Sequence, residues 1–173
     1  FIFMKPIILF LLSIISFPAF SAQGIYQTPE AFLLKAFDSK LPKPKALWIT
    51  KKLKPAIEAI MAHKMRMLRV RYWGKNQRTA WVLEEIGKEK PITVGIVINH
   101  NKIERIKVLE FRESRGWEVI HPFFTEQFKN AGLQQDHYLS SDINGISGAT
   151  LSVRALTKLS RLALFLHQQT PFK

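Results

Sequence analysis

The middle of the chain alternates apolar and polar residues in a way that is typical of a half-buried β-sheet. Leu68, Val70 and Tyr72 alternate with Arg69 and Arg71. A near-continuous apolar run follows later, as expected for a strand buried on both faces. The expected strands are residues 68–72, 79–86, 91–99 and 103–111. Turn residues separate them, so the sequence predicts an antiparallel meander.

Helical patterns lie on both sides of these strands. The expected helices cover residues 28–38, 46–62 and 122–131 and a long amphipathic stretch from about 150 to 166. Pro55 must kink the second helix or begin a new segment. In the third, we expect Phe123, Phe124 and Phe128 on one side. Helices before and after a meander place the chain in the α+β class.

The first 22 residues read as a targeting segment. Lys5 precedes an apolar run at 7–17, and small residues follow it. This arrangement is typical of a secretory signal peptide, because a membrane span needs about 20 apolar residues. An uncleaved anchor is the alternative. We therefore expect an exported protein, periplasmic or on the outer face of the cytoplasmic membrane, with a single domain over residues 23–173.

The composition removes several classes of site. The 173 residues include no cysteine, which excludes disulfides, thiolate metal sites and a cysteine nucleophile. The 5 histidines are scattered, so we nominate no metal ligand. Ser147 lacks the second glycine of a Gly-x-Ser-x-Gly elbow, and we nominate no catalytic residue.

The chain is strongly basic. It carries 26 Lys and Arg against 13 Asp and Glu, a formal net charge of +13. Such a charge attracts acidic proteins, anionic lipid or nucleic acid. Export and the absence of a basic motif interleaved with aromatic residues argue against nucleic acid. An acidic partner or a membrane surface is therefore favoured.

A turn of small residues precedes the last helix. Gly145 and Gly148 permit backbone conformations that other residues avoid. Residues 147–150 should lie at the helix N-terminus, where free N–H groups and the helix dipole favour a phosphate. The alternative is that Ser147 or Thr150 only caps the helix.

The motif Ser147-Gly148-Ala149-Thr150 resembles the signature of the FMN-binding domain family. Members include the G subunit of the Rnf complex and the C subunit of the sodium-pumping NADH:quinone oxidoreductase. The family consensus reads roughly Asp-x-x-Ser-Gly-Ala-Thr, and its threonine carries FMN through a phosphoester. The resemblance assigns that role to Thr150. Asn144 stands where the family usually has Asp.

A second motif lies upstream. Glu113-Ser114-Arg115-Gly116 is similar to the Glu-Thr-Pro-Gly loop of the same family. The flavin ring also needs an apolar or aromatic platform and a few polar contacts. Candidates for the polar edge are Arg115 and Glu113, and candidates for the platform are Trp117, Trp81, Trp73 and Phe123.

The resemblance implies an electron carrier rather than an enzyme with its own turnover. It implies loading by a flavin transferase that uses FAD and Mg²⁺, since a threonine hydroxyl is a poor nucleophile and no activating base adjoins Thr150. The carrier would exchange electrons with a membrane-bound redox partner. Two alternatives stay open: a non-redox module that holds FMN reversibly, and a flavin-dependent reductase.

Overall fold

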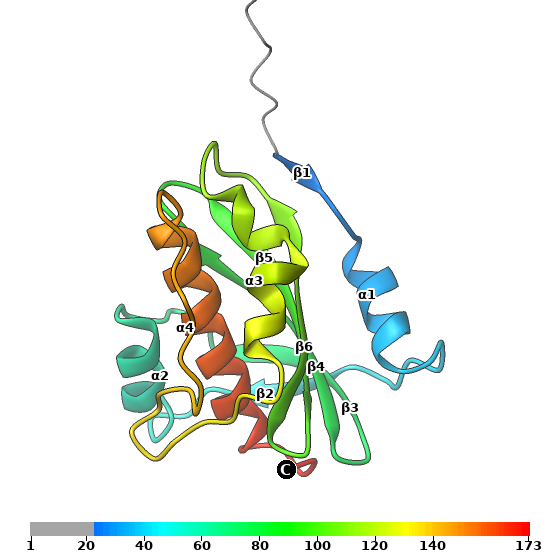
Figure 1. Ribbon diagram of the computed structural model, residues 1–173. Helices are drawn as coiled ribbons and strands as arrows, with labels where there is room; N and C mark the ends of the chain where they lie inside the picture. The colour runs from blue at the N-terminus through cyan, green and yellow to red at the C-terminus, as the bar shows by residue number, and fades with distance from the viewer. Residues whose placement is uncertain (1–22) are drawn as a thin grey trace, which may run out of the picture.

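The computed structural model describes residues 23–173 (Figure 1), so the signal peptide expected at 1–22 lies outside the described residues. The chain forms a 6-stranded antiparallel sheet in the order β1-β6-β5-β4-β3-β2. The strands are β1 (Gly24–Ile25), β2 (Lys45–Trp48), β3 (Arg69–Lys75), β4 (Arg78–Ile86), β5 (Pro91–Asn99) and β6 (Lys102–Phe111).

The predicted meander is confirmed as the centre of this sheet. Strands β3 to β6 follow one another in sequence and in space. All of β5 except its two end residues is buried, which explains its continuous apolar run. The two edge strands, β1 and β2, are the shortest of the six.

Helices cover both faces of the sheet, so the α+β class is confirmed. The helical elements are α1 (Pro29–Ala36), α2 (Lys54–Met61), η1 (Trp117–Ile120), α3 (Pro122–Thr125), η2 (Glu126–Phe128) and α4 (Thr150–His167). Figure 1 shows α2, α3 and α4 on one side of the sheet and α1 on the other. None of the helices in this part of the chain is both long and apolar enough to cross a bilayer.

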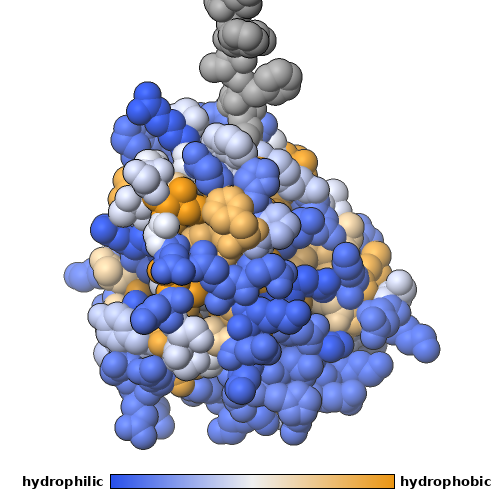
Figure 2. Space-filling view, viewed as in Figure 1, coloured by the Kyte–Doolittle hydropathy of each residue, from blue (hydrophilic) through white to orange (hydrophobic). Residues whose placement is uncertain are grey.

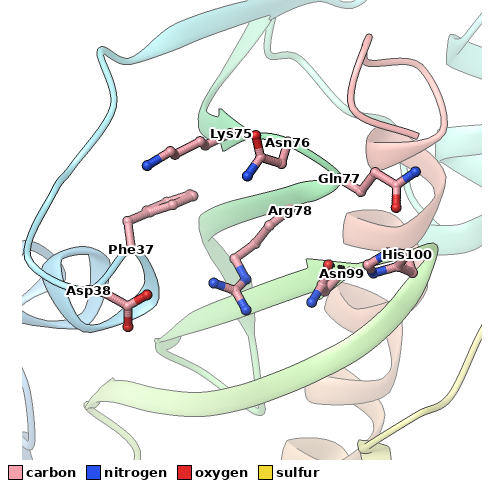
Figure 3. Close-up of a pocket in the computed structure, with 8 residues that line it drawn as sticks. All are labelled: Phe37, Asp38, Lys75, Asn76, Gln77, Arg78, Asn99 and His100. Carbon is pink, nitrogen blue, oxygen red and sulfur yellow. Dashed lines mark hydrogen bonds between the residues drawn. The ribbon is translucent and has the colours of Figure 1, made fainter.

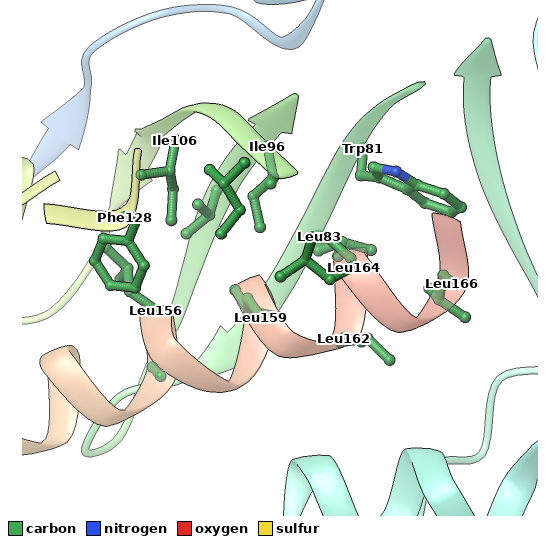
Figure 4. Close-up of a cluster of buried hydrophobic side chains, with 14 of the residues drawn as sticks. Trp81, Leu83, Ile96, Ile106, Phe128, Leu156, Leu159, Leu162, Leu164 and Leu166 are labelled. Atoms are coloured by element: carbon green, nitrogen blue, oxygen red, sulfur yellow. The ribbon is translucent and has the colours of Figure 1, made fainter. Parts of the chain in front are cut away.

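The main core lies between the sheet and α4 (Figure 4). Trp81 of β4 is fully buried, and the ring of Tyr72 stacks on it with centroids 5.0 Å apart. Leucines repeat along α4 at helical spacing and meet the sheet, and burying each such side chain stabilises the fold by about 1.5–3 kcal/mol. This core holds α4 against the sheet. The leucines are Leu156, Leu159, Leu162, Leu164 and Leu166.

The helix expected at 46–62 is wrong in its first part. Residues Lys45–Trp48 form β2, and the helix covers only Lys54–Met61. Pro55 lies in the first turn of α2, so it begins a new segment rather than kinking a longer helix. Strand β2 exists because it pairs with β3 over its whole length, a contact that the local sequence does not reveal.

The third expected helix is also shorter and broken. Residues 122–128 form α3 followed by the 3-10 turn η2, and Asn130, with a φ of 65°, turns the chain away. Phe124 and Phe128 are fully buried, whereas Phe123 is 63% exposed. The expectation that all three phenylalanines share one side is therefore wrong.

Candidate functional site

Two distant motifs meet at one end of the sheet. Figure 1 shows the loop that follows β6 and the first turn of α4 at the same end of the molecule. Between them lies a pocket of about 550 Å³. Residues 113–116 form one wall, residues 148–152 form the other, and Lys88 completes the lining. The sequence motifs around Gly116 and Thr150 therefore share one cavity.

The helix start in this pocket has no side-chain cap. Helix α4 begins at Thr150, and its N-cap residue is Ala149, at which no side-chain hydrogen bond caps the helix. The alternative in which Ser147 or Thr150 caps the helix is thus not observed. The first N–H groups of a helix have no intrahelical acceptor, and they form the positive end of the helix dipole. Thr150 is exposed at this point, so its hydroxyl is accessible from the pocket.

Two glycines with positive φ shape the pocket, each in its own way. Gly148 has a φ of 82°, and no atom lies within 4 Å of the place where a Cβ would be. Gly116 has a φ of 79°, but a Cβ there would lie 2.5 Å from Ser152 Oγ. Gly148 therefore leaves the approach to the helix start open, whereas Gly116 lets the upstream loop contact α4.

Glu113 fixes a third segment beside the pocket. Its side chain is buried, and Oε1 accepts hydrogen bonds from the backbone N–H groups of Lys88, Glu89 and Lys90 at 2.5, 2.7 and 2.9 Å. Burial alone raises the pKa of Glu113, but the three N–H groups and the Lys88 ammonium outweigh it, and the net pKa is lowered. The carboxylate is therefore charged and holds the turn at 87–90 in place.

The turn at 87–90 places the positively charged side chain of Lys88 at the pocket. The Lys88 side chain is 72% exposed and belongs to the pocket lining, as does the exposed side chain of Arg115. Lys88 precedes the Glu113 motif in the sequence and Arg115 lies within it, but both line the same pocket. Together with the N-terminus of α4, they favour an anionic ligand.

The pocket brings together most of the residues expected from the sequence. Its lining includes Glu113, Arg115, Gly116, Gly148, Ala149 and Thr150, and it excludes Asn144, Ser147 and Trp117. Asn144 is exposed, and its backbone N–H donates to Gln127 Oε1 at 2.8 Å. Ser147 is exposed one residue before the lining begins.

An aromatic group follows the upstream loop directly. Trp117 and Phe123 flank His121, with ring centroids 5.2 and 6.1 Å from the imidazole, and both are exposed. Figure 2, viewed from the same side as Figure 1, shows hydrophilic side chains over most of the surface and a smaller apolar group in the upper half. Trp81 and Trp73 are elsewhere: Trp81 is buried in the core and Trp73 lies on the opposite side of the sheet. Neither tryptophan can serve as a platform here.

Sequence reasoning missed Lys88 and Ser152. Lys88 lies in the turn between β4 and β5, far in sequence from both motifs. The meander itself carries a signal, because the β4–β5 turn and the end of β6 must lie at the same edge of the sheet. Ser152 is buried against Gly116, and only the three-dimensional contact identifies it.

A second hollow, of about 380 Å³, lies at the opposite end of the sheet (Figure 3). Two of its polar side chains bind the neighbouring carboxylate of Glu104: Arg78 donates to it from two nitrogens at 3.0 and 2.8 Å, and Asn99 donates to it at 2.9 Å. This hollow therefore has a structural explanation. Within residues 23–173, no cluster of three or more His, Cys, Asp or Glu residues could hold a metal ion.

Comparison with known proteins agrees with this geometry. Residues 87–164 match the family model described as the FMN-binding domain. No curated protein and no solved structure gives a significant match. The matched segment begins at the turn that carries Lys88 and ends within α4, so it contains every residue that lines the pocket. Residues 87–164, which contain both motifs and the whole pocket lining, are therefore similar to the FMN-binding domain family.

Proposed function

We propose that this protein is an exported flavoprotein that carries FMN on Thr150 through a phosphoester and relays electrons between membrane-associated partners. The family match supports flavin binding in general. The observation that carries the finer proposal is the position of Thr150: its exposed side chain lies at an uncapped helix start, inside a pocket shared with the second motif.

The residues present fit a flavin phosphate. The first turn of α4 offers backbone N–H groups, and Lys88 and Arg115 supply positive charge. The open space at Gly148 lets a phosphate approach the main chain. Trp117 and Phe123, exposed beside the loop, are the aromatic surface available to a ring tethered at Thr150. When bound, FMN would supply one- and two-electron transfer.

Attachment requires an external catalyst in this proposal. A bond forms between Thr150 Oγ1 and the FMN phosphorus of FAD, the pyrophosphate bond breaks, AMP leaves, and the hydroxyl proton passes to a base. The carboxylate in the pocket lining, Glu113, has a lowered pKa and is bound to three N–H groups, so it is a weak base. A flavin transferase with FAD and Mg²⁺ would therefore supply the activation.

The proposed location and partners rest on the sequence. The apolar run at 7–17 favours export to the periplasm or the outer face of the cytoplasmic membrane. A protein that carries a tethered flavin, and whose pocket offers no evident catalytic acid, is best suited to pass electrons between other proteins. We therefore propose a membrane-bound redox partner and no nucleic acid.

The test is mass spectrometry of the full chain coexpressed with a flavin transferase. The peptide that contains Thr150 should gain the mass of FMN minus water, and the flavin should stay with the chain in denaturing gel filtration. Thr150→Ala should abolish both signals. Thr157→Ala is the matched control, because Thr157 lies on the same helix and its hydroxyl only donates to Val153 O.

Two outcomes would contradict the proposal. If Thr150→Ala retained the added mass, another residue would be the attachment point. If the wild-type flavin separated from the chain on denaturation, the protein would bind FMN reversibly, the alternative for which Asn144 in place of the usual Asp is the sequence argument.

A further inference from the structure

A basic groove crosses the other face of the sheet. Helix α1 packs over Ala80, Val97 and Leu109 of β4, β5 and β6, and Trp73 of β3 packs against this cluster. Earlier in β3, Arg69 and Arg71 are exposed. Trp73 pairs with Ala80, so it lies on this face, and Arg71 and Arg69, two and four residues before it, lie on the same face. Here a groove of about 750 Å³ is lined by Pro29, Lys45, Arg69, Arg71, Trp73 and neighbouring residues. We call it the β2–β3 groove.

The cations of this groove have no acidic partner. Among the described residues, Lys45, Arg69 and Arg71 form no ion pair. Arg69 lies over the Trp48 ring at 5.8 Å. The Lys45 ammonium instead lies over the Phe172 ring at 4.7 Å, on the face that Lys45 shares with Tyr72, so the two arginines supply the charge of the groove.

The carboxylates of an adjoining hollow already bind another arginine. This hollow shares Arg69 and Arg71 with the groove and also contains Glu84 and Glu110. Both of these carboxylates bind Arg112, at 3.5 and 2.5 Å. Arg112 offsets one of these two negative charges, and Arg69 and Arg71 outnumber the other, so the groove and the adjoining hollow together remain positive.

The spacing of the two arginines matches an extended peptide. Arg69 and Arg71 are alternate residues of β3, so they lie on one face about 6.6 Å apart along the strand. Alternate side chains of any extended segment have the same spacing. Each guanidinium can bind a carboxylate through two parallel hydrogen bonds. Trp73, half-buried in the lining, adds an apolar surface.

We propose that the β2–β3 groove binds an extended acidic segment of a partner protein, with carboxylates at alternate positions facing Arg69 and Arg71. A flat bilayer would reach the rim of a groove rather than its floor. Single-stranded nucleic acid binds by stacking bases on open aromatic rings, whereas the Trp48 ring already carries the Arg69 guanidinium. The inference goes beyond flavin binding and does not depend on it.

The test uses the full chain and a fluorescent peptide of alternating Glu and Val. Fluorescence anisotropy should show saturable binding, and the same peptide with Gln for Glu should bind about tenfold more weakly or worse. Arg69→Gln with Arg71→Gln should weaken binding by a similar factor. Lys51→Gln with Lys52→Gln removes the same charge from an exposed turn, so it should change the affinity by only about twofold.

A second measurement needs no variant. A photoreactive group on the peptide should crosslink the wild-type chain within 45–48 or 69–73. Crosslinks elsewhere, equal losses in the two double variants, or no peptide binding would overturn the proposal. So would a groove-dependent preference for phosphatidylglycerol vesicles or a single-stranded oligonucleotide over the peptide.

Discussion

Three glycines near the pocket should respond to the same substitution in three different ways. Gly145 has open space around it and no positive φ, Gly148 has open space and a φ of 82°, and Gly116 has a φ of 79° with Ser152 Oγ only 2.5 Å from a new Cβ. Replacing each with alanine therefore separates backbone strain from steric overlap at one site.

The expected losses follow from these two effects. Gly145→Ala should change the free energy of unfolding by less than about 0.5 kcal/mol. Gly148→Ala adds only the left-handed backbone, at about 1–2 kcal/mol. Gly116→Ala adds the same strain and an overlap with a buried side chain, which costs about 1–3 kcal/mol more. The predicted order of destabilisation is Gly116, then Gly148, then Gly145.

Urea unfolding of the flavin-free chain measures all three. Ser152→Ala in the Gly116→Ala background removes the atom nearest the new Cβ, so it should recover part of the loss, with a coupling energy of about 0.5–3 kcal/mol against the single variants. Equal losses for Gly116→Ala and Gly148→Ala, or an additive double variant, would refute the contact between the loop and α4. Flavin content is a separate readout: Gly148→Ala should reduce it, because its methyl group enters the approach to Thr150.

Three further outcomes are expected. Glu113→Gln should destabilise the protein by about 1–3 kcal/mol at pH 7. The folded pKa of Glu113 is lowered from 4.5, so the stability that the carboxylate contributes should be lost as the pH falls below 4.5. Acid unfolding of the wild type and the variant measures this difference. Burial lowers the pKa of His167 from 6.5 to about 4, so the folded state rejects a proton that the unfolded chain accepts, and stability should fall by about 3 kcal/mol from pH 6.5 to 4. In His167→Gln, unfolding measured across that range should show a flatter pH profile. Phe124→Ala should cost about 3–5 kcal/mol in thermal unfolding and Phe123→Ala less than about 0.5 kcal/mol, because only Phe124 is buried; similar losses would contradict the observed packing.

The sequence predicts the parts of the fold whose signal is local. Strand β5 is recognisable because a strand buried on both faces must be apolar throughout, and α4 because its leucines recur at helical spacing. Strand β2 is not recognisable, since three of its four residues are exposed and only its pairing with β3 makes it a strand. Phe123 was misplaced because the sequence does not show where α3 gives way to η2.

The same difference between local signals and contacts of distant segments applies to the candidate site. Residues within each motif, such as Gly116 and Thr150, could be named from the sequence because each motif is contiguous. Lys88 belongs to neither motif, and its place in the pocket depends on the order of the meander and on a hydrogen-bonded turn that Glu113 organises from more than twenty residues away. Trp81 resembled a ring platform in the sequence, but the core between β4 and α4 buries it.

The start of α4 lacks a feature that usually stabilises a helix. An alanine at the N-cap forgoes a side-chain cap worth about 1 kcal/mol, although serines lie close by at 147 and 152. Gly148 adopts a φ of 82° that suits glycine, and no atom occupies the space beside it. A purely structural helix start would gain from a capping side chain here, whereas an anion seated on the first-turn N–H groups would be excluded by one. The missing cap, the open space at Gly148 and the exposed Thr150 therefore all support the proposal that a flavin phosphate binds at this helix start.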